Sequence, residues 1–150
     1  MAYRTPIQVL VYPVRHVETG MQYLLLKRTE ERGGFWQGVT GHTEKGEKII
    51  ECAKRELLEE TSFIPKFIFQ TEYTYTIDIA KEHKNEYPPN TKEFVEHVFV
   101  ARIDQKDEPA IDPNEHTEYT WCSYEEAIKL LKWDNNKKAL EYCHSLLKEE

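Results

Sequence analysis

The chain has 150 residues, of which 39% are hydrophobic, 31% charged and 12% aromatic, and its formal net charge is −7. This length lets one domain bury a sizeable core but is short for two, so we expect a single domain over residues 1–150. The composition excludes disordered and fibrous chains. No apolar run approaches the roughly 18 residues of a membrane span. The acidic balance argues against nucleic acid as the main partner, because contact with its phosphate backbone depends on Lys and Arg.

The N-terminus and the cysteines indicate the compartment. The chain runs directly into a strand-like stretch, without the cleavage pattern of a secretory signal. Cys52, Cys122 and Cys143 are odd in number and far apart in sequence. This usage favours reduced packing thiols over disulfides or a zinc site. We therefore expect a cytoplasmic protein with no membrane partner.

The predicted elements alternate between strands and helices along the chain. Runs rich in branched and aromatic residues predict strands at 7–14, 22–28, 35–41, 67–79, 94–103 and 117–122. The first two are separated by a short turn-like stretch and are expected to be neighbours in the sheet. Helix-forming runs cover 46–62, 123–131 and a last segment that starts at 134 or 135. Residues 81–93 predict a polar loop with a Pro pair. The pattern is typical of a layered α/β or α+β domain with a mixed sheet.

Three acids on the first predicted helix point to a functional site. Glu56, Glu59 and Glu60 fall within roughly 100° of arc on a helix, so their side chains can converge. Like charges at this spacing repel each other, and the arc overlaps the apolar side near Ala53 and Leu57. A solvated charged face is one interpretation. The other is a site for a hard divalent cation, which prefers several oxygen ligands, often carboxylates.

The sequence upstream resembles the signature of the Nudix hydrolase family. Its pattern, G-x5-E-x7-R-E-U-x-E-E-x-G-U with U apolar, is matched at six fixed positions: Gly41, Glu47, Arg55, Glu56, Glu59 and Glu60. Phe63 fills the last apolar position, whereas Ser62 stands where the pattern has Gly. That position lies just past the helix, where a left-handed conformation costs Ser about 1 kcal/mol. Because it carries no catalytic side chain, the difference affects the helix end and not the metal site.

The resemblance implies a fold and a chemistry. It implies a MutT-like α/β/α sandwich with a mixed sheet between helices, and hydrolysis of a phosphoanhydride in a substrate that contains a nucleoside diphosphate. It also implies Mg²⁺, with Mn²⁺ as an alternative, which polarises the phosphorus centre and acidifies a water. The implied ligands are Glu56, Glu59, Glu60 and the carbonyl of Gly41. Arg55 orients the carboxylates, Glu47 supports the loop, and Glu56 is our choice of general base.

A longer and looser resemblance indicates the substrate. Residues 35–41, 90–103 and 115–142 are similar to the branch that hydrolyses dihydroneopterin triphosphate and dATP and releases pyrophosphate. It implies that Arg28 contacts a phosphate, Trp36 lines the ring side of the pocket and Glu115 completes the metal site. Each has a structural alternative: Arg28 as a surface cation, Trp36 as a core residue and Glu115 as a turn cap. His116, beside Glu115, is a further candidate.

Other functions remain open from the sequence. The signature does not separate pterin or deoxynucleoside triphosphate hydrolysis from hydrolysis of 8-oxo-dGTP, ADP-ribose or a dinucleoside polyphosphate. A Nudix fold that senses a nucleotide without cutting it is a further alternative, although such a module is expected to lose acids that this chain retains. The expected partner is a small nucleotide or pterin triphosphate, and both a monomer and a homodimer are compatible with the sequence.

Overall fold

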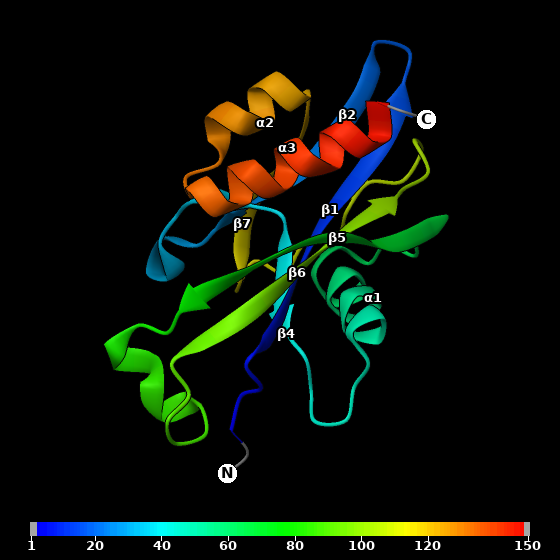
Figure 1. Ribbon diagram of the computed structural model, residues 1–150. Helices are drawn as coiled ribbons and strands as arrows, with labels where there is room; N and C mark the ends of the chain where they lie inside the picture. Colours follow the sequence, from blue (N-terminus) through cyan, green and yellow to red (C-terminus); the bar gives the residue numbers. More distant parts are fainter. Residues whose placement is uncertain (1–2, 149–150) are drawn as a thin grey trace.

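The computed structural model describes residues 3–148, whose strands form one seven-stranded mixed sheet (Figure 1). The strand order is β3-β2-β1-β6-β5, while β4 also pairs with β1 and β7 with β2. The central strand β1 (Ile7–Val17) runs parallel to β6 (Glu93–Arg102) and antiparallel to β2 (Gly20–Arg28). The expected mixed sheet between helices is confirmed.

The remaining elements follow the predicted order. The other strands are β3 (Trp36–Gln37), β4 (Val39–His42), β5 (Phe67–Asp78) and β7 (His116–Cys122). The helices are α1 (Ile49–Thr61), α2 (Tyr124–Leu130) and α3 (Asp134–Lys148), with short 3-10 helices η1 (Glu30–Arg32) and η2 (Lys81–Glu86). Within residues 3–148, no helix is long and apolar enough to span a membrane.

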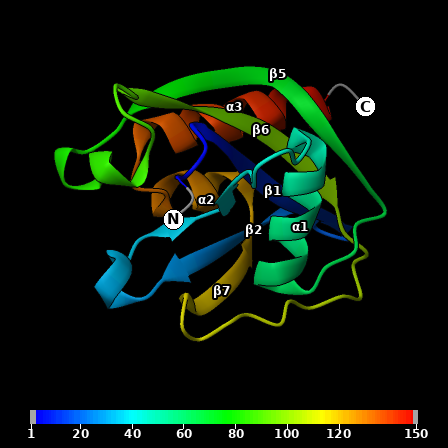
Figure 2. The same ribbon diagram turned by 90° about the horizontal axis from the view of Figure 1, so that it is seen from below.

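Two hydrophobic cores lie on opposite faces of the sheet. Because side chains alternate along a strand, Val9 and Val11 of β1 pack on the face that α1 covers, while Leu10 and Tyr12 pack under α2 and α3. All four are fully buried. Figure 2 shows β1 and β2 running between α1 and α2. The cysteines are free and buried, in agreement with packing thiols.

Three boundaries differ from the sequence prediction. Helix α1 begins at Ile49 and not at 46, because Gly46 has a φ of 78° that a right-handed helix excludes. The strand expected over 35–41 is divided at Gly38, where a Cβ would lie 2.8 Å from the Val11 carbonyl oxygen. The predicted loop at 81–93 contains η2, whose His83 and Glu86 side chains pair one turn apart.

The end of α1 explains the departure at Ser62. Ser62 has a φ of 67° and a ψ of 11°, which is the left-handed conformation in which glycine is preferred. Its N–H donates to the Leu58 carbonyl at 2.8 Å and closes the helix. The chain therefore keeps the helix end of the signature although it lacks the glycine.

Candidate active site

Helix α1 and strand β4 approach each other unusually closely at Gly41. A Cβ built on Gly41 would lie 2.1 Å from Cδ of Glu56. Gly41 also pairs with Val9 of the central strand, which fixes β4 in place. Only a residue without a side chain lets the Glu56 carboxylate lie against the β4 backbone. This contact gives the Gly41 position of the signature a steric cause.

Arg55 connects the signature residues through its guanidinium group. It donates to both carboxylate oxygens of Glu47, from Nε at 2.8 Å and from Nη2 at 3.0 Å. Its Nη1 donates to Glu56 at 2.8 Å and to Glu59 at 3.2 Å, and Nη2 also donates to the His42 carbonyl at 3.0 Å. The Glu47 contact raises the pKa of Arg55 and lowers that of Glu47. Both groups therefore stay charged, and the bidentate pair fixes the loop to the helix.

Glu56 and Glu60 form a carboxyl pair at the cavity wall. The residue Glu60 is only 4% exposed, and burial followed by the charge of Glu56 raises its pKa well above the usual range. Burial also raises the pKa of Glu56. The Nε2 atom of His116 lies 3.7 Å from Glu60, but burial lowers the pKa of His116 to about 4. The imidazole is therefore neutral near pH 7 and does not compensate the acids.

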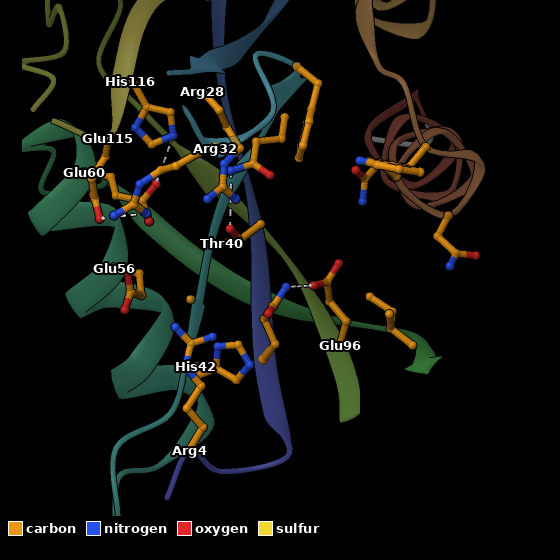
Figure 3. A pocket seen from close by; sticks show the side chains of 18 of the residues that line it. Arg4, Arg28, Arg32, Thr40, His42, Glu56, Glu60, Glu96, Glu115 and His116 are labelled. Carbon is orange, nitrogen blue, oxygen red and sulfur yellow. Dashed lines mark hydrogen bonds and ion pairs between the residues drawn. The ribbon is translucent and has the colours of Figure 1, made fainter. Parts of the chain in front are cut away.

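A cavity of about 690 Å³ is lined by these acids and, among other residues, by Arg28 and Arg32. Figure 3 shows Arg28 and Arg32 beside Glu60, Glu115 and His116 at one end of it. Arg32 lies 3.7 Å from Glu115, whereas the buried Nε of Arg28 has no hydrogen-bond partner within the described part of the chain. The ladder between β2 and β7 is irregular at Lys27 and Arg28, at the point where Arg28 enters the cavity. An anion is the ligand that such a pair of cations favours.

The structure brings most of the predicted site residues together. The cavity is lined by Arg28, Gly41, Arg55, Glu56, Glu60 and Glu115. Glu47 lies behind Arg55, and the Glu59 side chain is 56% exposed and held by Arg55 on the outer flank of α1.

Trp36 is not among the residues that line the cavity. It packs against the core under α2 and α3, and the aromatic lining of the cavity comes from Phe35 and Trp133. Side chains alternate along an extended segment, which is consistent with Phe35 lining the cavity while Trp36 packs on the core, the structural alternative that the sequence had left open.

Sequence reasoning also missed several residues of the cavity. Gln8, Arg32, Glu96 and Asn136 line it. A signal existed for Glu96, because a lone acid within the apolar run of a central strand is expensive to bury. Arg32 and Asn136 carry no local signal, since they reach the cavity through a 3-10 turn and through the packing of α3.

The acid pair fits a hard divalent cation. Within residues 3–148, no group of three or more His, Cys, Asp or Glu side chains already has an arrangement that could hold a metal ion. Glu56 and Glu60 nevertheless supply oxygen donors beside the Gly41 backbone, and their mutual repulsion is the kind that a cation relieves. Glu59 can join them only by releasing Arg55.

Comparison with known proteins identifies the family. A model of the NUDIX domain matches residues 5–143. The chain therefore belongs to the NUDIX family. It is a hydrolase of phosphoanhydride bonds in small nucleotide-like substrates. Members of this family generally use divalent metal ions.

Relatives of known name cover nearly the whole chain. The dihydroneopterin triphosphate diphosphatase of Haemophilus influenzae is 29% identical, over 94% of this chain and 89% of the relative. The protein of that name from Escherichia coli K12 is 28% identical, over 93% of this chain and 92% of the relative.

Solved structures agree with this similarity. A protein of Listeria monocytogenes described as a NUDIX hydrolase superposes with a TM-score of 0.84 at 32% identity, over 97% of this chain and 96% of that one. The structure of the E. coli dihydroneopterin triphosphate pyrophosphohydrolase superposes with a TM-score of 0.75 at 26% identity, over 95% of this chain and 97% of that one.

Proposed function

We propose that this chain, acting as a single domain, hydrolyses dihydroneopterin triphosphate or a related nucleoside triphosphate. Water adds to the α-phosphorus and the bond to the bridging oxygen breaks, so that a monophosphate and pyrophosphate leave. The observation that carries the proposal is one cavity lined by the Glu56–Glu60 pair, by Arg28 and Arg32 and by the rings of Phe35 and Trp133. The similarity to two named diphosphatases over more than nine-tenths of the chain supports the same substrate class.

The roles of the acids follow from their positions. Glu56, Glu60 and the Gly41 carbonyl would hold Mg²⁺ or Mn²⁺, with Glu59 and Glu115 at its edges. Bound there, the cation supplies charge neutralisation at the phosphates and a more acidic water. Glu56 is the proposed general base, because its carboxylate lies against the Gly41 backbone at the cavity wall and is held there by Arg55 at 2.8 Å.

The basic residues position the substrate and the acids. Arg28 and Arg32 bind the phosphates at the end of the cavity where they lie beside Glu60 and Glu115. Arg55 holds the Glu56 carboxylate at 2.8 Å and is itself held by Glu47, so this pair acts on the geometry of the base. Phe35 and Trp133, whose ring centroids are 5.7 Å apart in an edge-on arrangement, provide the apolar wall for a flat ring.

A panel assay tests the substrate. At slightly alkaline pH with Mg²⁺, we would follow pyrophosphate and phosphate release from dihydroneopterin triphosphate, dATP, 8-oxo-dGTP, ADP-ribose and a dinucleoside polyphosphate. Pyrophosphate release from the pterin or from dATP, abolished by a chelator, supports the proposal. Turnover of only another panel member keeps the family chemistry and rejects the substrate.

One variant tests the base. Glu56→Gln should lower kcat by at least about a hundredfold, the scale of a lost general base, while the fold is retained. The matched control is Glu51→Gln, which changes an exposed acid on the same helix and should leave turnover unchanged. Near-normal turnover in Glu56→Gln would reject Glu56 as the base.

A further inference from the structure

A second buried acid lies in the cavity, away from the metal-binding acids. Glu96 projects from β6, an interior strand of the sheet, and is 1% exposed, yet it lines the cavity. Figure 3 shows it on another part of the cavity wall from the group formed by Glu60, Glu115 and Arg28. Burial raises its pKa to about 7. Burying a carboxylate without a cation costs several kcal/mol, which an apolar residue at this position would avoid.

A hydrogen-bond network fixes the carboxylate plane of Glu96. The Gln8 amide donates to one carboxylate oxygen and the Tyr75 hydroxyl donates to the other. Asn136 in turn donates from Nδ2 to the Tyr75 hydroxyl at 3.2 Å. The Tyr12 hydroxyl donates to the Asn136 carbonyl at 2.8 Å and ties α3 to the sheet. All five residues thus belong to one network that spans β1, β5, β6 and α3.

This network leaves acceptor capacity on the carboxylate. An ionised carboxylate has about four acceptor positions, two on each oxygen. Gln8 and Tyr75 occupy one on each oxygen, so each oxygen keeps one further position. Two acceptors on neighbouring atoms of one plane match a ligand with two adjacent N–H donors.

The rest of the cavity defines where such a ligand lies. The arginines Arg28 and Arg32 stand at the end that binds phosphates, and Phe35 and Trp133 supply aromatic surface in the same cavity. A ligand with a polyphosphate at one end and a flat ring at the other can therefore present its ring edge to Glu96.

We propose that Glu96 selects the ring of the substrate, by accepting hydrogen bonds from a ring N–H and an adjacent exocyclic amino group. The 2-amino-4-oxopyrimidine edge of a pterin or of guanine has this donor pair. Adenine presents an acceptor nitrogen beside its amino group, and that nitrogen is repelled by an ionised carboxylate. This inference rests on the proposed function and narrows its substrate class to pterin and guanine rings over adenine.

The decisive comparison uses two substrates that differ by one amino group. dGTP and dITP share the sugar, the triphosphate and the ring N–H, but dITP lacks the exocyclic amine. The wild-type protein should have a kcat/KM at least tenfold higher for dGTP, the scale of one hydrogen bond to a charged group. Equal kcat/KM values for the two substrates would overturn the inference and leave the proposed function intact.

Variants assign this discrimination to Glu96. In Glu96→Gln, one acceptor oxygen becomes a donor amide group. The kcat/KM for dGTP should then be no more than about three times the kcat/KM for dITP. Glu93→Gln is the matched control, because Glu93 is an exposed acid on the same strand and its loss should keep the wild-type ratio. If Glu96→Gln does not fold, Tyr75→Phe is the test variant in its place. It should lower the dGTP-to-dITP ratio of kcat/KM values at least threefold. An unchanged ratio in the folded variant rejects Glu96 as the selecting residue.

A binding measurement separates this inference from the proposed function. Calorimetry with dGMP and dIMP, without metal, reports the ring site even if no triphosphate is hydrolysed. Tighter binding of dGMP, lost in Glu96→Gln, supports the ring site whatever the assay shows. Equal affinities together with absent turnover reject both proposals.

Discussion

Glu56 occupies the space that a side chain at Gly41 would need, since a Cβ there would lie 2.1 Å from the Glu56 Cδ atom. The glycine of the signature therefore protects the position of the central acid and does not serve a turn. Its φ lies outside the left-handed region, because the glycines with positive φ are Gly20, Gly33, Gly34 and Gly46 within residues 3–148.

Gly41→Ala should accordingly impair activity more than stability. The new methyl group meets the far end of a flexible side chain, so Glu56 moves and kcat/KM should fall at least about tenfold. Gly38→Ala is the contrasting variant, because its Cβ meets the Val11 carbonyl oxygen at 2.8 Å. It should lose about 1–3 kcal/mol of unfolding free energy. Urea unfolding and steady-state kinetics on both variants test the contrast, and a strongly unfolded Gly41→Ala contradicts it.

Glu47 should act through Arg55 and not on the substrate. Glu47→Gln weakens the bidentate contact at 2.8 and 3.0 Å and so loosens Arg55 from Glu56. We expect kcat to fall about tenfold or more with KM nearly constant, because the proposed base Glu56 is displaced while the proposed phosphate contacts of Arg28 persist. Glu51→Gln serves as the exposed control. A change confined to KM would instead place Glu47 in substrate binding.

The sequence predicted those parts of the site that depend on local spacing. Glu56 and Glu60 meet because they are one helical turn apart, and the motif that carries them is contiguous. Glu96, Gln8 and Asn136 come from β6, β1 and α3, and only the packed sheet brings them together. The sequence could not decide between a core role and a pocket role for Trp36, since a shift of one residue on an extended segment reverses the side that a ring faces.

Metal should reverse the effect of removing Glu60. Without metal, Glu60→Gln should raise the unfolding free energy by about 1–3 kcal/mol, because a buried acid beside Glu56 is replaced by a neutral group. When the Mg²⁺ concentration is about 100 times its Kd, the unfolding free energy of the wild type should rise by about 2.7 kcal/mol. The unfolding free energy of the variant should rise much less. Thermal unfolding with and without Mg²⁺ measures both effects. An equal metal increment in the two proteins would exclude Glu60 as a ligand.

Ser62 should be a site at which glycine stabilises the protein. The left-handed φ of 67° costs Ser about 1 kcal/mol, part of which is offset because Gly loses more entropy on folding. Ser62→Gly should therefore raise the unfolding free energy by about 0.5 kcal/mol and leave kcat unchanged. Ser145→Gly, within α3, should lower it by about 0.5–1 kcal/mol. Urea unfolding of both variants should give opposite signs.

Glu96 should make the protein less stable as the pH rises. Its pKa is about 7 in the folded protein, against 4.5 for an ordinary Glu, so the folded state binds more protons between these values and stability falls through this range. The environment that holds the acid is uncharged, with the Gln8 amide and the Tyr75 hydroxyl as its contacts. The unfolding free energy of Glu96→Gln should be closest to that of the wild type near pH 4.5 and should exceed it by up to about 3 kcal/mol above pH 7. Urea unfolding at pH 5, 6, 7 and 8 tests this slope, with Glu93→Gln as the exposed control that should show none. A difference between Glu96→Gln and the wild type that does not change with pH would mean that Glu96 is already ionised at pH 5 in the folded protein.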